Sequence, residues 1–212
     1  MIPPYPVYLF DVDGTLLESA GDICGAIQEV LASTSRKDVS FEFLRRYIGR
    51  HLLDLFQDLF PGEPAETYDT LIRRYREVYA ARDHRLTRPY PGVAATLAAL
   101  GGRKATVTTK GTPTTRAVLE KFDLLQYFDH VQGTDGFPHK PAPDVVLASM
   151  SALGARPEEC LLIGDSAPDM EAGRRAGVKI CAALYGYGDP EELRRWEPDY
   201  LISDIRQLSP GG

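Results

Sequence analysis

The sequence predicts an α/β fold, a doubly wound parallel sheet with an inserted α-helical module. Short apolar runs rich in β-branched or aromatic residues alternate with helical patterns, which is typical of a parallel sheet covered on both faces. An insertion of roughly 70 residues lies between the first run and the second, far more than one connecting helix needs. The predicted strands are 7–10, 105–108, 128–132, 161–164 and 179–183.

Start and stop signals justify the helices between these strands. Thr112 is placed as an N-cap with Pro113 at the first helical position, where a proline is tolerated because its missing N–H has no partner anyway. A second helix is expected over 144–153, ending near Gly154. A third begins at 167–169. Each helix therefore follows a predicted strand.

The long segment after the first strand predicts a module of its own. Apolar residues recur there at helical spacing, so four helical stretches are expected. We expect a helical cap domain over 16–87 and a catalytic core over 1–15 and 88–212. The helical stretches are 23–31, 41–47, 52–60 and 71–79.

Composition limits the class of protein and its partners. The formal charge of −6 argues against nucleic acid, whose phosphates need a basic face. Apolar runs fall short of the roughly 20 residues of a membrane span, and no basic residue precedes a long apolar start, so we expect a cytoplasmic protein. Three cysteines without a Cys-x-x-Cys pair, namely Cys24, Cys160 and Cys181, suit a reducing compartment and offer no zinc site. Monomer and homodimer both remain open.

Polar residues follow the predicted strands where a parallel sheet places its ligands. Asp11 and Asp13 follow the first strand, and two carboxylates so close repel each other unless a cation or a proton lies between them. Thr108 and Thr109 follow the second strand and offer hydroxyls and amides that suit phosphate oxygens. Each feature alone also fits a turn or a helix cap.

Two further loops add an ammonium and two more acids. Lys140 precedes the helix at 144–153, and Asp165 and Asp169 surround the start of the next helix. A lone lysine is usually a solvated surface charge, and Asp169 alone would suit a helix dipole. Four strand-end loops that each carry an acid, a hydroxyl or a cation indicate an active site.

The ordered set of loops resembles the haloacid dehalogenase-like phosphohydrolase superfamily. The matching pieces are 11–15, Thr108, 140–141 and 164–165 with Asp169. The cap position resembles the subgroup with a helical cap after the first motif, and the tail at 185–188 and 198–200 is similar to phosphoglycolate phosphatases. The chain departs from these at Thr109, where they usually carry Asn, and at 136–139.

The resemblance implies a magnesium-dependent phosphatase. Asp11 would attack phosphorus and form an aspartyl phosphate. Asp11 and Asp165 would hold Mg²⁺ through their side chains, and Asp13 through its backbone carbonyl. Magnesium suits the site because it prefers oxygen ligands and neutralises both nucleophile and phosphate.

The resemblance also assigns the remaining roles. Asp13 would protonate the leaving oxygen and later deprotonate water, a contribution commonly of about 10²–10⁴-fold. Lys140 and Thr108 would hold the phosphoryl oxygens with Thr109 beside them, and Asp169 would orient water or Lys140.

The substrate is expected to be a small phosphorylated metabolite. The best candidate is 2-phosphoglycolate, whose carboxylate needs a cation, and Arg50 in the cap loop is the proposed one, although a solvated surface charge explains Arg50 equally well. A β-phosphoglucomutase-like mutase, a pyrophosphatase and a sugar-phosphate phosphatase remain alternatives. A phospho-aspartate receiver module is the alternative outside enzymes, but receivers carry no helical insertion after the first strand.

Overall fold

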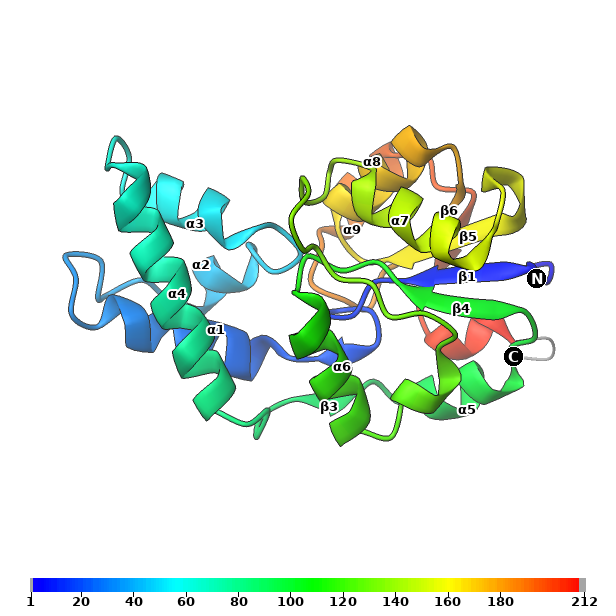
Figure 1. Ribbon diagram of the computed structural model, residues 1–212, viewed down its shortest axis with the longest axis horizontal. Coiled ribbons are helices and arrows are strands. Elements are labelled where there is room, and N and C mark those ends of the chain that lie inside the picture. The colour runs from blue at the N-terminus through cyan, green and yellow to red at the C-terminus, as the bar shows by residue number, and fades with distance from the viewer. Residues whose placement is uncertain (1, 210–212) are drawn as a thin grey trace.

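The computed structural model describes residues 2–209 and contains a five-stranded sheet in which every pair of neighbours is parallel (Figure 1). The strand order is β4–β1–β5–β6–β7, so β1 lies inside the sheet with β4 and β5 on its two sides. The carboxyl ends of these three strands are therefore adjacent. The predicted fold class is confirmed. The strands are β1 Val7–Phe10, β4 Arg103–Thr106, β5 Cys160–Gly164, β6 Lys179–Ala183 and β7 Tyr200–Ile202.

Helices cover both faces of this sheet. Residues of β1 alternate between two apolar clusters, Tyr8 and Phe10 in one, Val7 and Leu9 in the other, because successive side chains of a strand point to opposite faces. One face is covered by α5 Val93–Ala99, α6 Thr112–Lys121 and the 3-10 helix η3 Ile205–Leu208. The other is covered by α7 Asp144–Leu153, α8 Ala167–Ala176 and α9 Pro190–Arg195. Two short 3-10 turns, η1 Leu125–Tyr127 and η2 Pro157–Glu159, complete the connections.

Two local predictions are wrong. No strand forms at 128–132, where the chain makes only an isolated bridge between Ala105 and His130. The Thr106 hydroxyl accepts from the Gln132 amide and donates to its carbonyl, so a side chain takes the place of a ladder partner. Helix α6 begins at Thr112 itself, with Gly111 at the N-cap.

Four further helices form a separate unit beyond the carboxyl ends of the strands (Figure 1). They share an apolar core of their own, distinct from the two clusters on the sheet. None of the helices within residues 2–209 combines the length and the apolar character that a membrane span requires. The helices are α1 Ala20–Leu31, α2 Phe41–Arg45, α3 Leu52–Leu59 and α4 Ala65–Ala81.

A two-stranded antiparallel ribbon joins the helical unit to the sheet. Its strands are β2 Leu17–Glu18, where the chain leaves the sheet, and β3 Arg88–Pro89, where it returns. The boundaries expected from the sequence, after residues 15 and 87, lie next to this ribbon. The division into cap and core stays a prediction.

The buried position of β1 generates a stability prediction. Leu9 is fully buried in the middle of β1, so Leu9→Ala is expected to lower the free energy of unfolding by about 2–5 kcal/mol, through lost burial and the cavity left behind. Urea denaturation measures the change. Leu147→Ala on the exposed side of α7 is the control and is expected to stay within about 0.5 kcal/mol. Equal losses in the two variants would contradict the packing described.

Candidate active site

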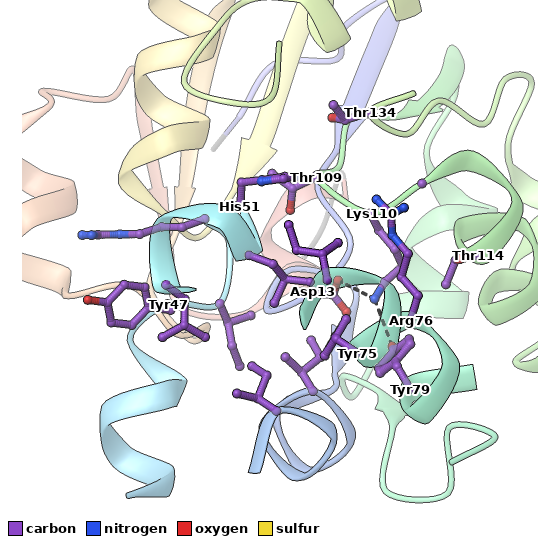
Figure 2. Close-up of a pocket in the computed structure, with 18 of the residues that line it drawn as sticks. Asp13, Tyr47, His51, Tyr75, Arg76, Tyr79, Thr109, Lys110, Thr114 and Thr134 are labelled. Atoms are coloured by element: carbon purple, nitrogen blue, oxygen red, sulfur yellow. Dashed lines mark hydrogen bonds and ion pairs between the residues drawn. The ribbon is translucent and has the colours of Figure 1, made fainter. Parts of the chain in front are cut away.

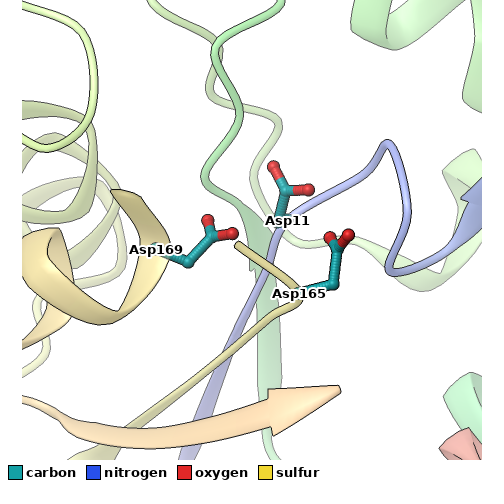
Figure 3. A group of neighbouring side chains, drawn as sticks. All are labelled: Asp11, Asp165 and Asp169. Carbon is teal, nitrogen blue, oxygen red and sulfur yellow. The ribbon is translucent and has the colours of Figure 1, made fainter. Parts of the chain in front are cut away.

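Three buried carboxylates meet at the carboxyl ends of β1 and β5 (Figure 3). Asp11 follows β1, Asp165 follows β5, and Asp169 lies in the first turn of α8. One oxygen of each lies within 4.8 Å of the others. The parallel pairing of β1 with β5 brings Asp11 and Asp165 together although the sequence separates them widely.

Lys140 holds this cluster from one side. Its ammonium donates to Asp11 Oδ1 at 2.7 Å, to Asp169 Oδ1 and to the carbonyl of Val107 at 2.9 Å, so all three N–H groups have acceptors. Burial alone would lower the pKa of Lys140, but Asp11 and Asp169 raise it above its usual value. The side chain is therefore a buried cation.

One ammonium does not balance three carboxylates. Burial raises the pKa of Asp11 well above its usual value against the opposing pull of Lys140, and burial together with Asp169 raises the pKa of Asp165 to about 7. The second oxygen of Asp11 is buried and has no hydrogen-bond partner among the residues that the structure describes. Carboxylate oxygens whose negative charge is not compensated are suitable ligands for a divalent cation such as Mg²⁺.

The carboxylate of Asp165 is fixed by the loop after β1 and by the chain after β6. The Thr15 hydroxyl donates to Oδ1 at 2.9 Å, and the Tyr187 amide donates to Oδ2 at 2.8 Å. Gly14 has φ +94°, and a Cβ there would lie 2.1 Å from Asp165 Oδ2. Position 14 therefore requires glycine for two reasons, the close approach of the Asp165 carboxylate and the positive φ angle of the backbone.

Asp169 is oriented by the start of α8. Its Oδ2 accepts from the amide and the hydroxyl of Ser166, a capping box that satisfies the first N–H groups of the helix. Oδ1 is thereby left for Lys140. Asp169, which the sequence placed near Lys140, contacts it directly.

Asp13 turns its side chain away from the three carboxylates. Oδ1 accepts from the Ser19 hydroxyl at 2.7 Å, and Oδ2 forms an ion pair with Lys110 Nζ at 3.0 Å. The cluster within 4.8 Å accordingly contains Asp169 and not the Asp13 side chain. The metal role predicted for Asp13 concerned its backbone carbonyl and stays a prediction.

The two threonines after β4 lie at different depths. Thr108 is buried, and its hydroxyl accepts from the Lys110 amide at 3.3 Å. Thr109 is partly exposed and lines a cavity. Because β4 pairs with β1, both threonines follow the strand next to Asp11.

A cavity of about 350 Å³ lies between the helical unit and the sheet (Figure 2). Asp13 and Lys110 line it from the sheet side, and Tyr75 and Tyr79 line it from α4. Arg50 also lines it but is exposed, with its guanidinium 5.5 Å from the centre of the Tyr47 ring.

Lys110 was not predicted as a site residue, although the sequence places it directly after the two threonines. Its position between Asp13 and the helical unit depends on how α4 is placed at the carboxyl ends of the strands. No local sequence pattern encodes that placement.

The helical unit touches the sheet edge beside this cavity. Gly49 has φ +92°, and a Cβ there would lie 2.8 Å from the Ser166 hydroxyl. Next to it, the His51 ring stacks on His139 with ring centres 4.1 Å apart. Burial and His139 lower the pKa of His51, which favours a neutral ring. His139, one of the unusual residues before Lys140, thus contacts the helical unit at His51.

Comparisons with known proteins agree with this geometry. A model of the "Haloacid dehalogenase-like hydrolase" family matches residues 8–183. A phosphoglycolate phosphatase of Aquifex aeolicus is 35% identical over 201 residues, covering 93% of this chain and 92% of that protein. Phosphoglycolate phosphatase 1 of Pseudomonas aeruginosa is 33% identical over 212 residues, covering 95% and 78%. The crystal structure of a predicted phosphatase from Clostridium acetobutylicum has a TM-score of 0.90 and 27% identity, covering 97% of each chain.

The raised pKa of Asp165 generates a prediction for the metal-free protein. Because this pKa is about 7 in the folded state against a usual 3.8, the folded state binds more protons between these values. The contribution to stability is full below the lower value and is lost as the pH rises through about 7. Urea denaturation in EDTA is expected to show a larger loss from pH 4 to pH 8 in the original protein than in Asp165→Asn. Identical pH dependence would contradict the raised pKa.

Proposed function

This chain belongs to the haloacid dehalogenase-like hydrolase family and is a phosphatase, and we propose that it hydrolyses a small phosphomonoester with Mg²⁺ through an aspartyl phosphate on Asp11. The predicted family and class of enzyme are confirmed by the match over 8–183 and by the phosphatase relatives. The observation that carries the proposal is how the two carboxylate oxygens of Asp11 are placed. Lys140 holds one of its oxygens, and the other is buried without a hydrogen-bond partner in the described residues.

The two steps of hydrolysis divide between two aspartates. An oxygen of Asp11 bonds to phosphorus as the ester P–O bond breaks, and Asp13 donates a proton to the leaving oxygen. Asp13 then takes a proton from water as that water attacks phosphorus, which releases inorganic phosphate and restores Asp11. Thr108 holds a phosphoryl oxygen, Lys140 places its positive charge beside Asp11 and the phosphoryl group, and Thr109 lies next to them at the cavity.

The metal ligands we propose are the side chains of Asp11 and Asp165 and the backbone carbonyl of Asp13. A bound Mg²⁺ neutralises charge on the phosphoryl oxygens and on the carboxylates around it. The fixed orientation of Asp165 supports its role, because Thr15 and Tyr187 hold it by hydrogen bonds. Asp169 keeps Lys140 in place and is a positioning residue in this scheme.

The substrate we propose is 2-phosphoglycolate. Relatives that cover nearly the whole chain are named phosphoglycolate phosphatases, which supports this choice. The molecule carries a carboxylate next to its phosphate ester, so the site needs a cation besides Lys140. Arg50 remains a candidate at the exposed border of the cavity.

The proposed roles predict severe losses in two variants. Asp11→Asn removes the nucleophile and Asp13→Asn removes the acid and base, so each is expected to lower phosphate release from 2-phosphoglycolate by at least about 100-fold while remaining folded. Asp69→Asn, on the exposed side of α4, is the matched control and is expected to keep full activity. Substantial turnover in either site variant would refute the roles. An isomerised sugar phosphate without release of phosphate would favour a mutase.

The proposed metal site predicts that magnesium raises the stability of the protein. Saturation at 100 times the dissociation constant is expected to add about 2.7 kcal/mol at pH 8, measured by thermal denaturation. The gain is expected to shrink at pH 5.5, because protons compete for Asp165, whose pKa is about 7. Asp165→Asn is expected to abolish the gain, and EDTA to abolish phosphate release. Unchanged turnover in EDTA would remove magnesium from the mechanism.

A further inference from the structure

A buried cation in the cavity has no part in the chemistry proposed so far. The side chain of Lys110 is 10% exposed and lies between Asp13 of the sheet edge and Tyr79 of α4 (Figure 2). Its ammonium is 3.0 Å from Asp13 Oδ2 and donates to the Tyr79 hydroxyl at 2.9 Å. Asp13 is the acid proposed for the leaving oxygen, so Lys110 lies next to the leaving group.

We propose that Lys110 binds a carboxylate on the leaving group and thereby selects phosphate esters of 2-hydroxy acids. The inference rests on the proposed function, because that function places the leaving oxygen at Asp13. It also assigns to Lys110 the recognition role that the sequence suggested for Arg50.

The hydrogen-bond capacity of Lys110 supports this role. An ammonium has three N–H groups, and Asp13 and Tyr79 accept two of them. No acceptor for the third is found in residues 2–209. Lys140 differs, because its three N–H groups are all used by Asp11, Asp169 and the Val107 carbonyl. Of the two ammonium groups beside Asp11 and Asp13, Lys110 is thus the one with a donor left for a substrate oxygen.

The charge of Lys110 is secured by its neighbours. Its ammonium forms an ion pair with Asp13 Oδ2 at 3.0 Å and donates to the Tyr79 hydroxyl at 2.9 Å. Two other cations of the cavity wall, Arg50 and Arg76, are exposed. An ion pair in a desolvated site is stronger than one at the surface, where water screens it. A substrate carboxylate therefore gains most from Lys110.

The reach of the substrate fits this arrangement. In 2-phosphoglycolate a single methylene group separates the ester oxygen from the carboxyl carbon. With the ester oxygen at the Asp13 carboxylate, a carboxylate one methylene group away lies in the neighbourhood of Lys110 Nζ, which is 3.0 Å from Asp13 Oδ2. A carboxylate on a longer chain would lie farther from Lys110, and other parts of the wall are apolar, such as Ile23 and Ile27. Selection of the 2-hydroxy acid class follows from this short distance.

The experiment compares two substrates that differ in the carboxylate. 2-Phosphoglycolate and 2-hydroxyethyl phosphate share the ester linkage, but only the first has a charged leaving group. Lys110→Met is expected to lower kcat/KM for 2-phosphoglycolate by about 30-fold or more relative to 2-hydroxyethyl phosphate, the loss typical of one partner removed from a buried charge pair. Arg76→Met, which removes a cation from the exposed wall, is expected to keep the original ratio of the two values.

Three outcomes would overturn the inference. Equal losses for both substrates in Lys110→Met would mean that Lys110 acts by positioning Asp13. A larger change of the ratio in Arg50→Met would assign the carboxylate to Arg50. Equal hydrolysis of both substrates by the original protein would exclude selection altogether, and this measurement needs no variant to fold.

The same assays separate this inference from the proposed function. If p-nitrophenyl phosphate and 2-phosphoglycolate are both hydrolysed and Asp11→Asn abolishes the activity, the proposed function stands whatever Lys110 does. If the original protein releases no phosphate from any ester, the proposed function fails and the inference fails with it.

Discussion

The buried group of three carboxylates around one ammonium is the constraint on which the site depends. Charges taken out of water are costly unless partners compensate them, and Lys140 compensates only part of the negative charge of Asp11, Asp165 and Asp169. The backbone amides of Tyr187 and Ser166 donate further hydrogen bonds, to Asp165 and Asp169 respectively. We propose that a bound cation completes this balance. The reaction and the buried carboxylates therefore both require the positive charge of that cation.

The sheet and the helical unit contribute different things to the proposed reaction. The register of β1 between β4 and β5 brings the charged groups together, and the apolar faces of the sheet hold that register firmly. The helical unit adds Tyr75 and Tyr79 to the cavity wall and approaches the sheet edge at Gly49. The groups proposed to act on phosphate thus lie on the sheet, whereas the residue proposed to select the leaving group lies in the cavity at the boundary.

The failures of sequence reasoning have physical causes. Residues 128–132 have the composition of a strand, yet they pair with β4 only by an isolated bridge at His130, and at Gln132 the Thr106 hydroxyl replaces a backbone partner. Lys110 looked like part of a helix entrance, because its partners Asp13 and Tyr79 come from distant parts of the chain. Arg50, which the sequence suggested for the substrate carboxylate, lines the cavity at its exposed border, where water screens its charge, and its role stays a prediction.

The sequence by itself determined the alternation of strands and helices, the inserted helical segment and the acids after β1 and β5. These features are readable because apolar periodicity, turn residues and strand ends are local properties of the chain. Only the tertiary structure decided that Lys140 joins Asp11 to Asp169 and that Lys110 lies between Asp13 and Tyr79. Such pairs depend on strand order and on how α4 packs over the sheet edge, and no local pattern specifies either.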